Sequence, residues 1–228
     1  WQPWALVNAA GFVRVDEAKR EPRHWRENVA GPAVLAAACA RHGVRLLGFS
    51  SDLVFDGEST RPYVEGDAPR PLSAYGRSKL EAERQMLALA PDALVVRTAA
   101  FFGPWDRQNF VTLALDALRR GEAVVAPSDQ WVSPTYVPDL ARHALDLLLD
   151  REDGIWHLTN GTALTWHELA LQLAAAARLD AGSLRAVPRS AMTGRAPRPA
   201  NSALTSSRGV LMPTLDAAID RFARHWLR

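Results

Sequence analysis

The fold of this chain is decided by one stretch, Val44-Arg45-Leu46-Leu47-Gly48-Phe49-Ser50-Ser51. Its largely apolar residues predict a buried strand over 44–49, with the two serines at the carboxyl end. The preceding residues 22–41 are rich in alanine and predict a helix. Strands that alternate with helices predict an α/β fold with a parallel sheet covered on both faces. Such sheets bind ligands at the carboxyl ends of their strands, where Ser50 and Ser51 are placed.

The same alternation continues along the chain. Further strands are predicted at residues 5–8, 93–97 and 123–126, and further helices at residues 75–89, 110–120, 138–149, 165–178 and 215–227. Thr165 stands three residues before Glu168, which is the spacing of a capping box at a helix start. These elements together predict a partial Rossmann-type, doubly wound parallel sheet with a smaller α/β substrate-binding lobe.

The helix after the strand at 44–49 carries a second informative stretch, Ser73-Ala74-Tyr75-Gly76-Arg77-Ser78-Lys79. A Tyr and a Lys four residues apart share one helix face, so the ammonium lies near the phenol. A nearby cation lowers the pKa of a phenol, which is normally near 10. With a hydroxyl from the strand end, these groups predict reduction of a ketone with a nicotinamide cofactor. The Tyr–Lys spacing alone also arises by chance on solvated helices, so its surroundings carry the argument.

Motifs around this pair follow one another in a fixed order. They occupy residues 7–11, 13–18, 28–31, 50–57, 62–67, 75–79, 97–98, 109–110, 129–140 and 198–202. The series resembles the extended short-chain dehydrogenase/reductases, and within them the dTDP-4-dehydrorhamnose reductase-like branch. The resemblance covers essentially the whole chain.

This resemblance implies a role for particular residues. Ser51, Tyr75 and Lys79 would be catalytic: Ser51 donates a hydrogen bond to the substrate carbonyl oxygen, Tyr75 donates the proton, and Lys79 lowers the phenol pKa and holds the cofactor ribose. The cofactor would be NADPH or NADH, bound by Asn8, Ala9, Ala10, Ser50, Tyr75 and Lys79. The substrate would be a nucleotide-linked 4-keto-6-deoxy sugar, bound by Asp52, Ala100, Asn109, Trp131 and Arg198. The guanidinium of Arg198 suits a diphosphate, and Asn28 would brace the lysine.

The glycine-rich turn that opens a dinucleotide-binding fold is not found in the sequence. Neither Gly-x-Gly-x-x-Gly nor Gly-x-x-Gly-x-x-Gly occurs, and residue 1 stands just before a strand that the family places in mid-domain. We therefore expect a fragment of a longer polypeptide. Residues 1–107 would form the C-terminal part of the dinucleotide-binding domain. Residues 108–228 would form mainly the substrate-binding lobe, with the chain crossing between the two.

Three departures from the family pattern bear on the substrate. Leu53 replaces a usual Tyr, Ala100 replaces a Trp beside the sugar, and Trp131-Val132 replaces a usual Phe-Gly or Ile-Gly pair. Loss of that Trp removes a stacking surface of about 1 kcal/mol. The alternative hypothesis is therefore a non-catalytic sugar-nucleotide- or cofactor-binding regulatory domain on the same fold. An epimerase or dehydratase fits less well, because Asp52 is the only carboxylate beside Ser51.

Composition narrows the protein class further. The 27 basic and 25 acidic residues are interspersed, which argues against a nucleic-acid partner. No apolar run approaches the length of a membrane span, and the single cysteine, Cys39, fits a reducing compartment. We expect a cytoplasmic protein with a nucleotide-sugar substrate, and no metal site. The sequence leaves open whether the chain forms a homodimer or is fused to another enzyme domain.

Overall fold

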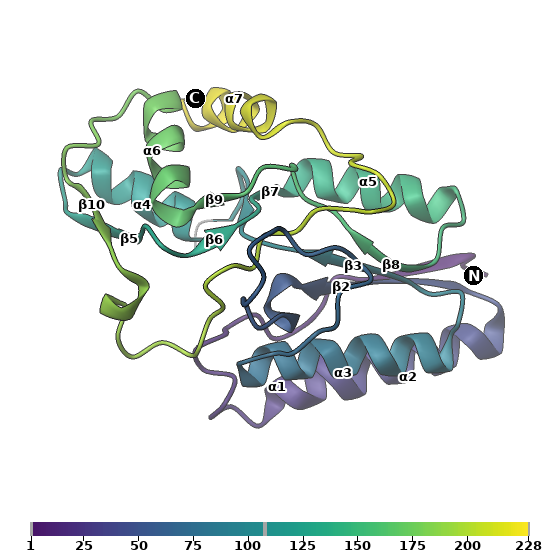
Figure 1. The fold of residues 1–228 in the computed structure, drawn as a ribbon. Helices are drawn as coiled ribbons and strands as arrows, with labels where there is room; N and C mark the ends of the chain where they lie inside the picture. The colour runs from purple at the N-terminus through teal and green to yellow at the C-terminus, as the bar shows by residue number, and fades with distance from the viewer. Residues whose placement is uncertain (1, 107–108, 228) are drawn as a thin grey trace.

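The computed structural model describes residues 2–106 and 109–227 of the chain. Within them, a four-stranded parallel sheet has the strand order β1-β2-β3-β8. The strands are β1 (Ala5–Asn8), β2 (Arg45–Ser51), β3 (Leu94–Thr98) and β8 (Gly154–His157). The predicted α/β fold with a parallel sheet is confirmed (Figure 1).

Helices cover both faces of this sheet. The helices α2 (Gly31–His42) and α3 (Ala74–Leu89) pack together on one face, and α5 (Val137–Leu149) covers the other (Figure 1). Alternate strand residues point to opposite faces, so each face has its own core. Leu46 and Val95 pack with α2 and α3, whereas Leu47, Leu94 and Val96 pack with α5.

A smaller part packs beside the sheet. Its parallel pair β5 (Val124–Pro127) and β10 (Leu184–Val187) is covered by α4 (Phe110–Arg119) and α6 (Trp166–Ala176), and α7 (Leu215–Trp226) packs on α6. Two short pairs, β4 (Phe101–Phe102) with β7 (Thr135–Tyr136) and β6 (Trp131–Val132) with β9 (Leu164–Thr165), lie between the parts. The predicted capping box is present, because the Thr165 and Glu168 side chains each bond the other's backbone N–H.

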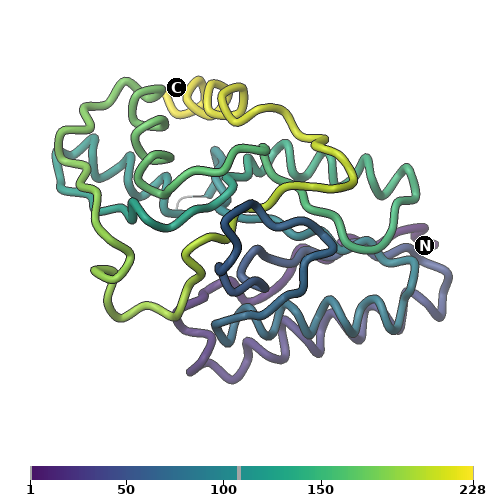
Figure 2. The backbone as a smooth tube through the Cα atoms, in the orientation of Figure 1, coloured from purple at the N-terminus to yellow at the C-terminus, as the bar shows by residue number. Residues whose placement is uncertain are grey.

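The chain crosses between the two parts more than once. The elements α5 and β8 return to the sheet after β7, and the segment 188–200, which we name the strap, leaves β10 and reaches the N-terminal segment (Figure 2). Beyond the strap, Leu204 forms a parallel bridge with Tyr63. The boundary predicted between residues 107 and 108 falls outside the described residues.

The predicted helix over 22–41 is divided in the structure. It comprises α1 (Arg23–Trp25), a π-helix (Arg26–Ala30) and α2. Pro32 has no N–H to donate to the carbonyl of Asn28, and the Gly31 N–H bonds to Arg26 O five residues back. Such π-turns are frequent at functional sites, and this one buries Asn28. Across residues 2–106 and 109–227, every helix is too short or too polar to cross a bilayer.

Candidate active site

The carboxyl end of β2 supplies the first part of the site. Ser51 ends the strand, and its side-chain oxygen accepts a hydrogen bond from Leu53 N at 3.1 Å, which starts a short 3₁₀ helix (Asp52–Val54). The Ser51 hydroxyl donates to Asp52 Oδ1 at 2.8 Å. The predicted placement of Ser51 at a strand end is therefore found, and its hydroxyl is oriented by its neighbour.

The start of α3 supplies the second part. Ser73 caps the helix by accepting from Gly76 N at 3.0 Å. A Cβ at position 76 would lie 2.1 Å from Leu53 O, so only glycine allows α3 to pack this closely on the turn after Ser51. This contact brings the Tyr75 phenol beside the side chains of Ser51, with which it forms a hydrogen bond, and Asp52.

The two titratable groups beside Ser51 have shifted pKa values. Burial, and then the Asp52 carboxylate, raise the pKa of Tyr75, while the interaction with Ser51 lowers it; the net shift is upward. Burial also raises the pKa of Asp52 to about 6, although the Ser202 and Ser51 hydroxyls donate to its oxygens at 2.6 and 2.8 Å and oppose the rise. At neutral pH Tyr75 keeps its proton, which a general acid requires.

Lys79 lies one helical turn beyond Tyr75. Its Nζ is 5.8 Å from the centroid of the Tyr75 ring and donates to Phe49 O on β2 at 3.2 Å. Burial lowers the pKa of Lys79 to about 8, and the charge of Glu83 opposes this shift. The lysine therefore carries its positive charge at neutral pH. The predicted lowering of the Tyr75 pKa by Lys79 is not found, because the net shift of that pKa is upward and Lys79 is not among its causes.

The segment 8–11, which we name the cradle, approaches Lys79 at Gly11. The side chain of Asn28 bonds the backbone N and O of Phe12 at 2.8 and 3.1 Å and donates to Ser78 on α3 at 3.1 Å. A Cβ on Gly11 would lie 3.0 Å from Asn28 Oδ1 and 3.6 Å from Lys79 Nζ. Asn8 ends β1, and Ala9 and Ala10 lead from it to Gly11, which packs so closely on Asn28 and Lys79 that a side chain at position 11 would press on Asn28 and touch Lys79. The Ala10 N–H bonds to the side chain of Asn8 at 3.2 Å.

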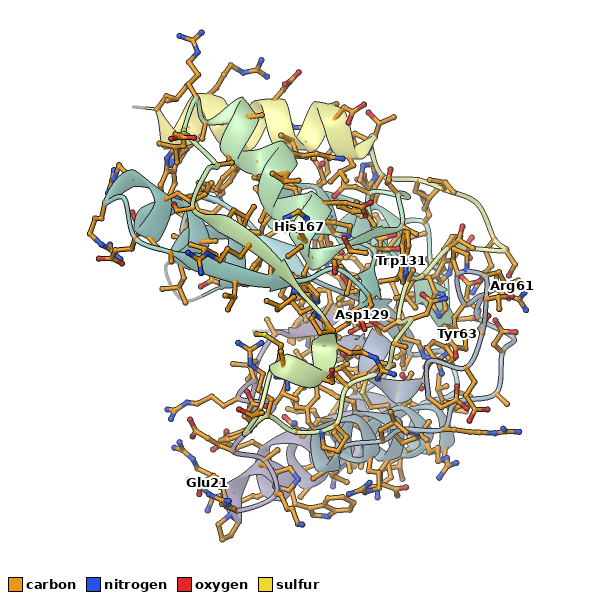
Figure 3. All side chains as sticks on the ribbon, turned by 60° about the vertical axis from the view of Figure 1, so that its left-hand side comes forward. Glu21, Arg61, Tyr63, Asp129, Trp131 and His167 are labelled. Atoms are coloured by element: carbon orange, nitrogen blue, oxygen red, sulfur yellow. The ribbon has the colours of Figure 1, made fainter. Side chains whose placement is uncertain are left out.

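The other predicted residues occupy different environments. The Ser50 hydroxyl donates to Glu83, and Asn109 caps α4 by accepting from Thr112 N at 2.9 Å. Ala100 has a φ of +40°, in the left-handed region that few non-glycine residues adopt. Trp131 is 43% exposed on β6, near Asp129 at the junction of the two parts (Figure 3). The structure thus brings the side chains of Ser51, Asp52, Tyr75 and Lys79 together. The side chains of Asn109 and Ser50 bond to other residues instead.

Arg198 belongs to a separate cavity under the strap. The cavity has a volume of about 640 Å³ and is lined by Asp129, Arg189, Arg195 and Arg198 together with neighbouring strap residues. Arg198 pairs with Asp16, its Nη1 lying 2.6 Å from Asp16 Oδ1. Arginines around a cavity of this size suit a phosphorylated ligand.

Sequence reasoning missed four residues that the structure connects to the site. Ser202 bonds Asp52, Asp16 holds Arg198, and a buried pair of Glu83 and Arg97 lies behind Ser50. The motif that contains Arg198 also contains Ser202, but no pattern in it points to Asp52. Glu83 could have been suspected from its spacing, four residues beyond Lys79 on the same helix face.

Comparison with known proteins agrees with the fold. A family model described as the RmlD substrate binding domain matches residues 1–216. A dTDP-4-keto-6-deoxy-D-glucose reductase from Streptomyces niveus is 36% identical over 200 residues, which are 87% of this chain and 69% of the relative. A dTDP-4-dehydrorhamnose reductase from Streptomyces griseus is 35% identical over 214 residues, which are 91% of this chain and 70% of the relative.

Solved structures give the same result. A dTDP-4-dehydrorhamnose reductase from Bacillus anthracis, in complex with NADP, superposes with a TM-score of 0.91 at 28% identity, over 97% of this chain and 80% of that one. An ortholog from Clostridium acetobutylicum gives 0.93 at 28% identity, over 99% and 82%. The chain has the fold of the Rossmann-type reductases. It belongs to the RmlD-like family of sugar-nucleotide 4-ketoreductases, which confirms the resemblance found in its motifs.

Proposed function

We propose that this protein reduces the 4-keto group of a nucleotide-linked 6-deoxy sugar with NADPH or NADH. The observation that carries the proposal is the meeting of Ser51, Tyr75 and Lys79 at the carboxyl edge of a parallel sheet. The relatives' names supply the substrate class, since they include reductases of dTDP-linked keto sugars.

The cradle beside Lys79 is the proposed cofactor position. Asn8, Ala9 and Ala10 would lie along the cofactor, and the Lys79 ammonium would bond its ribose hydroxyls. When bound, the nicotinamide supplies the hydride for the ketone carbon. The chain's own contribution is to orient the ketone and to manage the proton that its oxygen requires.

The proton comes from Tyr75. As the carbonyl oxygen gains negative charge, the Tyr75 hydroxyl donates its proton and the Ser51 hydroxyl donates a hydrogen bond. The raised pKa of Tyr75 ensures that this proton is present at neutral pH. Lys79, protonated below about pH 8, then stabilises the phenolate until solvent returns the proton.

The cavity under the strap is the proposed position of the nucleotide diphosphate. Arg198, Arg195 and Arg189 are among the residues that line it. Trp131 lies on β6 next to the segment that carries Asp129 and Gln130, which also line this cavity. An aromatic ring at that position would replace the stacking surface that Ala100 does not provide.

The test compares two Tyr→Phe variants of this chain. Turnover is followed as NADPH or NADH oxidation with a dTDP-4-keto-6-deoxy sugar, after calorimetric titration with each cofactor. Tyr75→Phe should lower kcat by at least about 100-fold, because it removes the proton donor, with no loss of cofactor binding. Tyr136→Phe is the matched control, because Tyr136 is buried in the smaller part and its loss should leave kcat unchanged.

Three outcomes would contradict the proposal. Turnover of Tyr75→Phe near that of the unchanged protein would exclude Tyr75 as the acid. Cofactor binding without reduction of any dTDP-4-keto sugar would favour the non-catalytic alternative. Absence of both binding and turnover would exclude a reductase function for the chain.

A further inference from the structure

A buried ion pair lies directly behind the site. Glu83 on α3 and Arg97 on β3 form two parallel hydrogen bonds, Nε to Oε1 at 2.8 Å and Nη2 to Oε2 at 2.7 Å. Their side chains are only 3% and 2% exposed. Removing two charges from water is so costly that apolar side chains of similar volume often stabilise a protein as well or better. Stability alone therefore does not explain why an ion pair occupies this position.

The pair connects the elements that carry the catalytic groups. The hydroxyl of Ser50, the residue before Ser51, donates to Glu83 Oε1. Glu83 follows Lys79 by one helical turn, as Lys79 follows Tyr75. Arg97 is paired with Ser50 in the register of β2 and β3 and lies 3.5 Å from His157 Nε2 on β8. One carboxylate thus joins the end of β2 to the helix that carries Tyr75 and Lys79.

The charges around Lys79 give Glu83 a second effect. From α3 the lysine faces Tyr75 and Glu83, from β2 the carbonyl of Phe49, and from the segment after β1 the uncharged Gly11. Glu83 itself faces Ser50, Arg97 and Lys79. His157, behind Arg97, has a pKa lowered by burial and donates through Nδ1 to Thr205 O, so it is neutral. Glu83 is therefore the carboxylate that favours the charged form of Lys79.

We infer that Glu83 is a positioning residue for the proposed reduction, held in place by Arg97. Its carboxylate fixes the Ser50–Ser51 strand end against α3, and its charge keeps Lys79 protonated. Glu83 touches neither substrate nor cofactor in this scheme. The inference rests on the proposed function for its catalytic consequence, whereas its effect on Lys79 can be measured without turnover.

The experiment uses three variants of this chain. Glu83→Gln removes the charge and leaves Arg97 unpaired. The double variant Glu83→Met with Arg97→Met removes both charges and restores a neutral interior, so it keeps the protein folded if the single variant does not. Glu81→Gln is the matched control: it makes the same chemical change on the same helix, at a residue that bonds Gln85 and stands apart from the buried pair.

The readout independent of activity is the titration of Lys79 itself. Lys19 and Lys79 are the two lysines in the sequence, so NMR of isotope-labelled lysine side chains resolves Lys79 once Lys19→Arg has assigned it. Glu83→Gln and the double variant should each move the Lys79 titration to lower pH, and Glu81→Gln should not. The basic limb of the kcat profile should move in the same direction, and kcat should fall at least about tenfold, because the catalytic groups lose their alignment.

The outcomes separate the inference from the proposed function. A double variant that folds and shows the unchanged Lys79 titration and the unchanged kcat profile would overturn the inference. A shift of the Lys79 titration to lower pH in the double variant would support the inference, whether or not the unchanged protein reduces a keto sugar. Absence of turnover in the unchanged protein would count against the proposed function alone. A fall in unfolding free energy with no change in the Lys79 titration would show that the pair is merely structural.

Discussion

At position 79 the chain carries a lysine rather than an arginine. Only two of the 27 basic residues in this chain are lysines, and one of them is Lys79. An arginine would keep its charge at all accessible pH values and spread it over a planar group. The compact ammonium of lysine fits between Tyr75 and Phe49 O, and burial brings its pKa to about 8. In a chain that otherwise uses arginine, a lysine here indicates a specific need for that smaller group.

Asp52 provides a prediction about stability and pH. Its pKa in the folded protein is raised from 3.8 to about 6, so the folded state binds this proton more tightly than the unfolded state. The resulting stabilisation is fully present below pH 3.8 and is lost as pH rises through about 6. Asp52→Asn should therefore raise the free energy of unfolding by about 1–3 kcal/mol at pH 7 and flatten its pH dependence between these values.

Urea denaturation at a series of pH values measures this effect. Asp220→Asn is the control, because Asp220 is exposed on α7, pairs with none of the described residues, and its change should leave the profile unchanged. The hydroxyls of Ser51 and Ser202 can rotate to accept from the new amide, so the fold has no reason to fail. A lower stability of Asp52→Asn at pH 7 would contradict the assignment of a costly buried carboxylate.

The sequence predicted the local parts of the site and missed the long-range ones. Tyr75 and Lys79 share a helix turn, and Ser51 ends a strand, so periodicity and family resemblance together located them. Ser202 meets Asp52 across 150 residues of chain. Glu83 resembles the half-buried Glu81 in sequence, and the position of Arg97 on the neighbouring strand distinguishes the two. Contacts that depend on how distant elements pack leave no periodic signal.

At the scale of elements, the contact between α3 and the 3₁₀ helix is the most demanding. A Cβ at Gly76 would lie 2.1 Å from Leu53 O and 3.0 Å from Pro71 Cβ. Gly76→Ala should therefore lower the free energy of unfolding by about 2–4 kcal/mol, and should lower kcat by moving Tyr75 away from Ser51. Chemical denaturation and NADPH oxidation measure the two effects.

Gly66→Ala is the matched control for that substitution. A Cβ at Gly66 would meet no atom within 4 Å, and its backbone is not in the left-handed region. Its stability should stay within about 0.5 kcal/mol of the unchanged protein. Equal stability of the two variants would mean that α3 does not need its close approach to the turn after Ser51.

Helix boundaries show where element prediction reaches its limit. The capping box fixed the start of α6 correctly, because Thr165 and Glu168 act within one turn. The alanine-rich run 22–41 predicted one continuous helix, but the structure inserts a π-turn that buries Asn28 between Phe12 and Ser78. The alanine-rich pattern gives no indication of this π-turn, because the turn serves the contacts of Asn28 with Phe12 and Ser78, which lie in distant segments.

At the scale of the whole molecule, the strap is held at both ends by carboxylates. Asp129 accepts from the backbone N–H of Arg189 at 2.6 Å, and Asp16 accepts from the backbone N–H of Ala196 at 2.8 Å and pairs with Arg198. Asp16→Asn should weaken the second anchor, because it removes the charge that Arg198 pairs with. Trypsin cleavage after the exposed Arg195 should then accelerate about fivefold, which corresponds to about 1 kcal/mol.

Limited proteolysis followed by mass spectrometry detects that cleavage. Glu17→Gln is the control, because Arg14, exposed on the same segment, is the one partner of the Glu17 carboxylate among the residues that the structure describes. Equal cleavage rates for Asp16→Asn and the unchanged protein would mean that Asp16 does not restrain the strap. If Asp16 also competes with a diphosphate for Arg198, the variant should bind a dTDP-linked sugar with higher affinity, which calorimetry measures.

The repeated crossing of the chain has a consequence for how such proteins diversify. The smaller part is encoded by separate runs, 110–132, 164–187 and 215–226, and the elements α5 and β8 of the sheet lie between the first two. A single genetic crossover therefore always divides the smaller part or removes strands from the sheet. New specificities in this architecture should arise by point substitution at the proposed substrate positions, such as Ala100 and Trp131, rather than by exchange of whole lobes between genes.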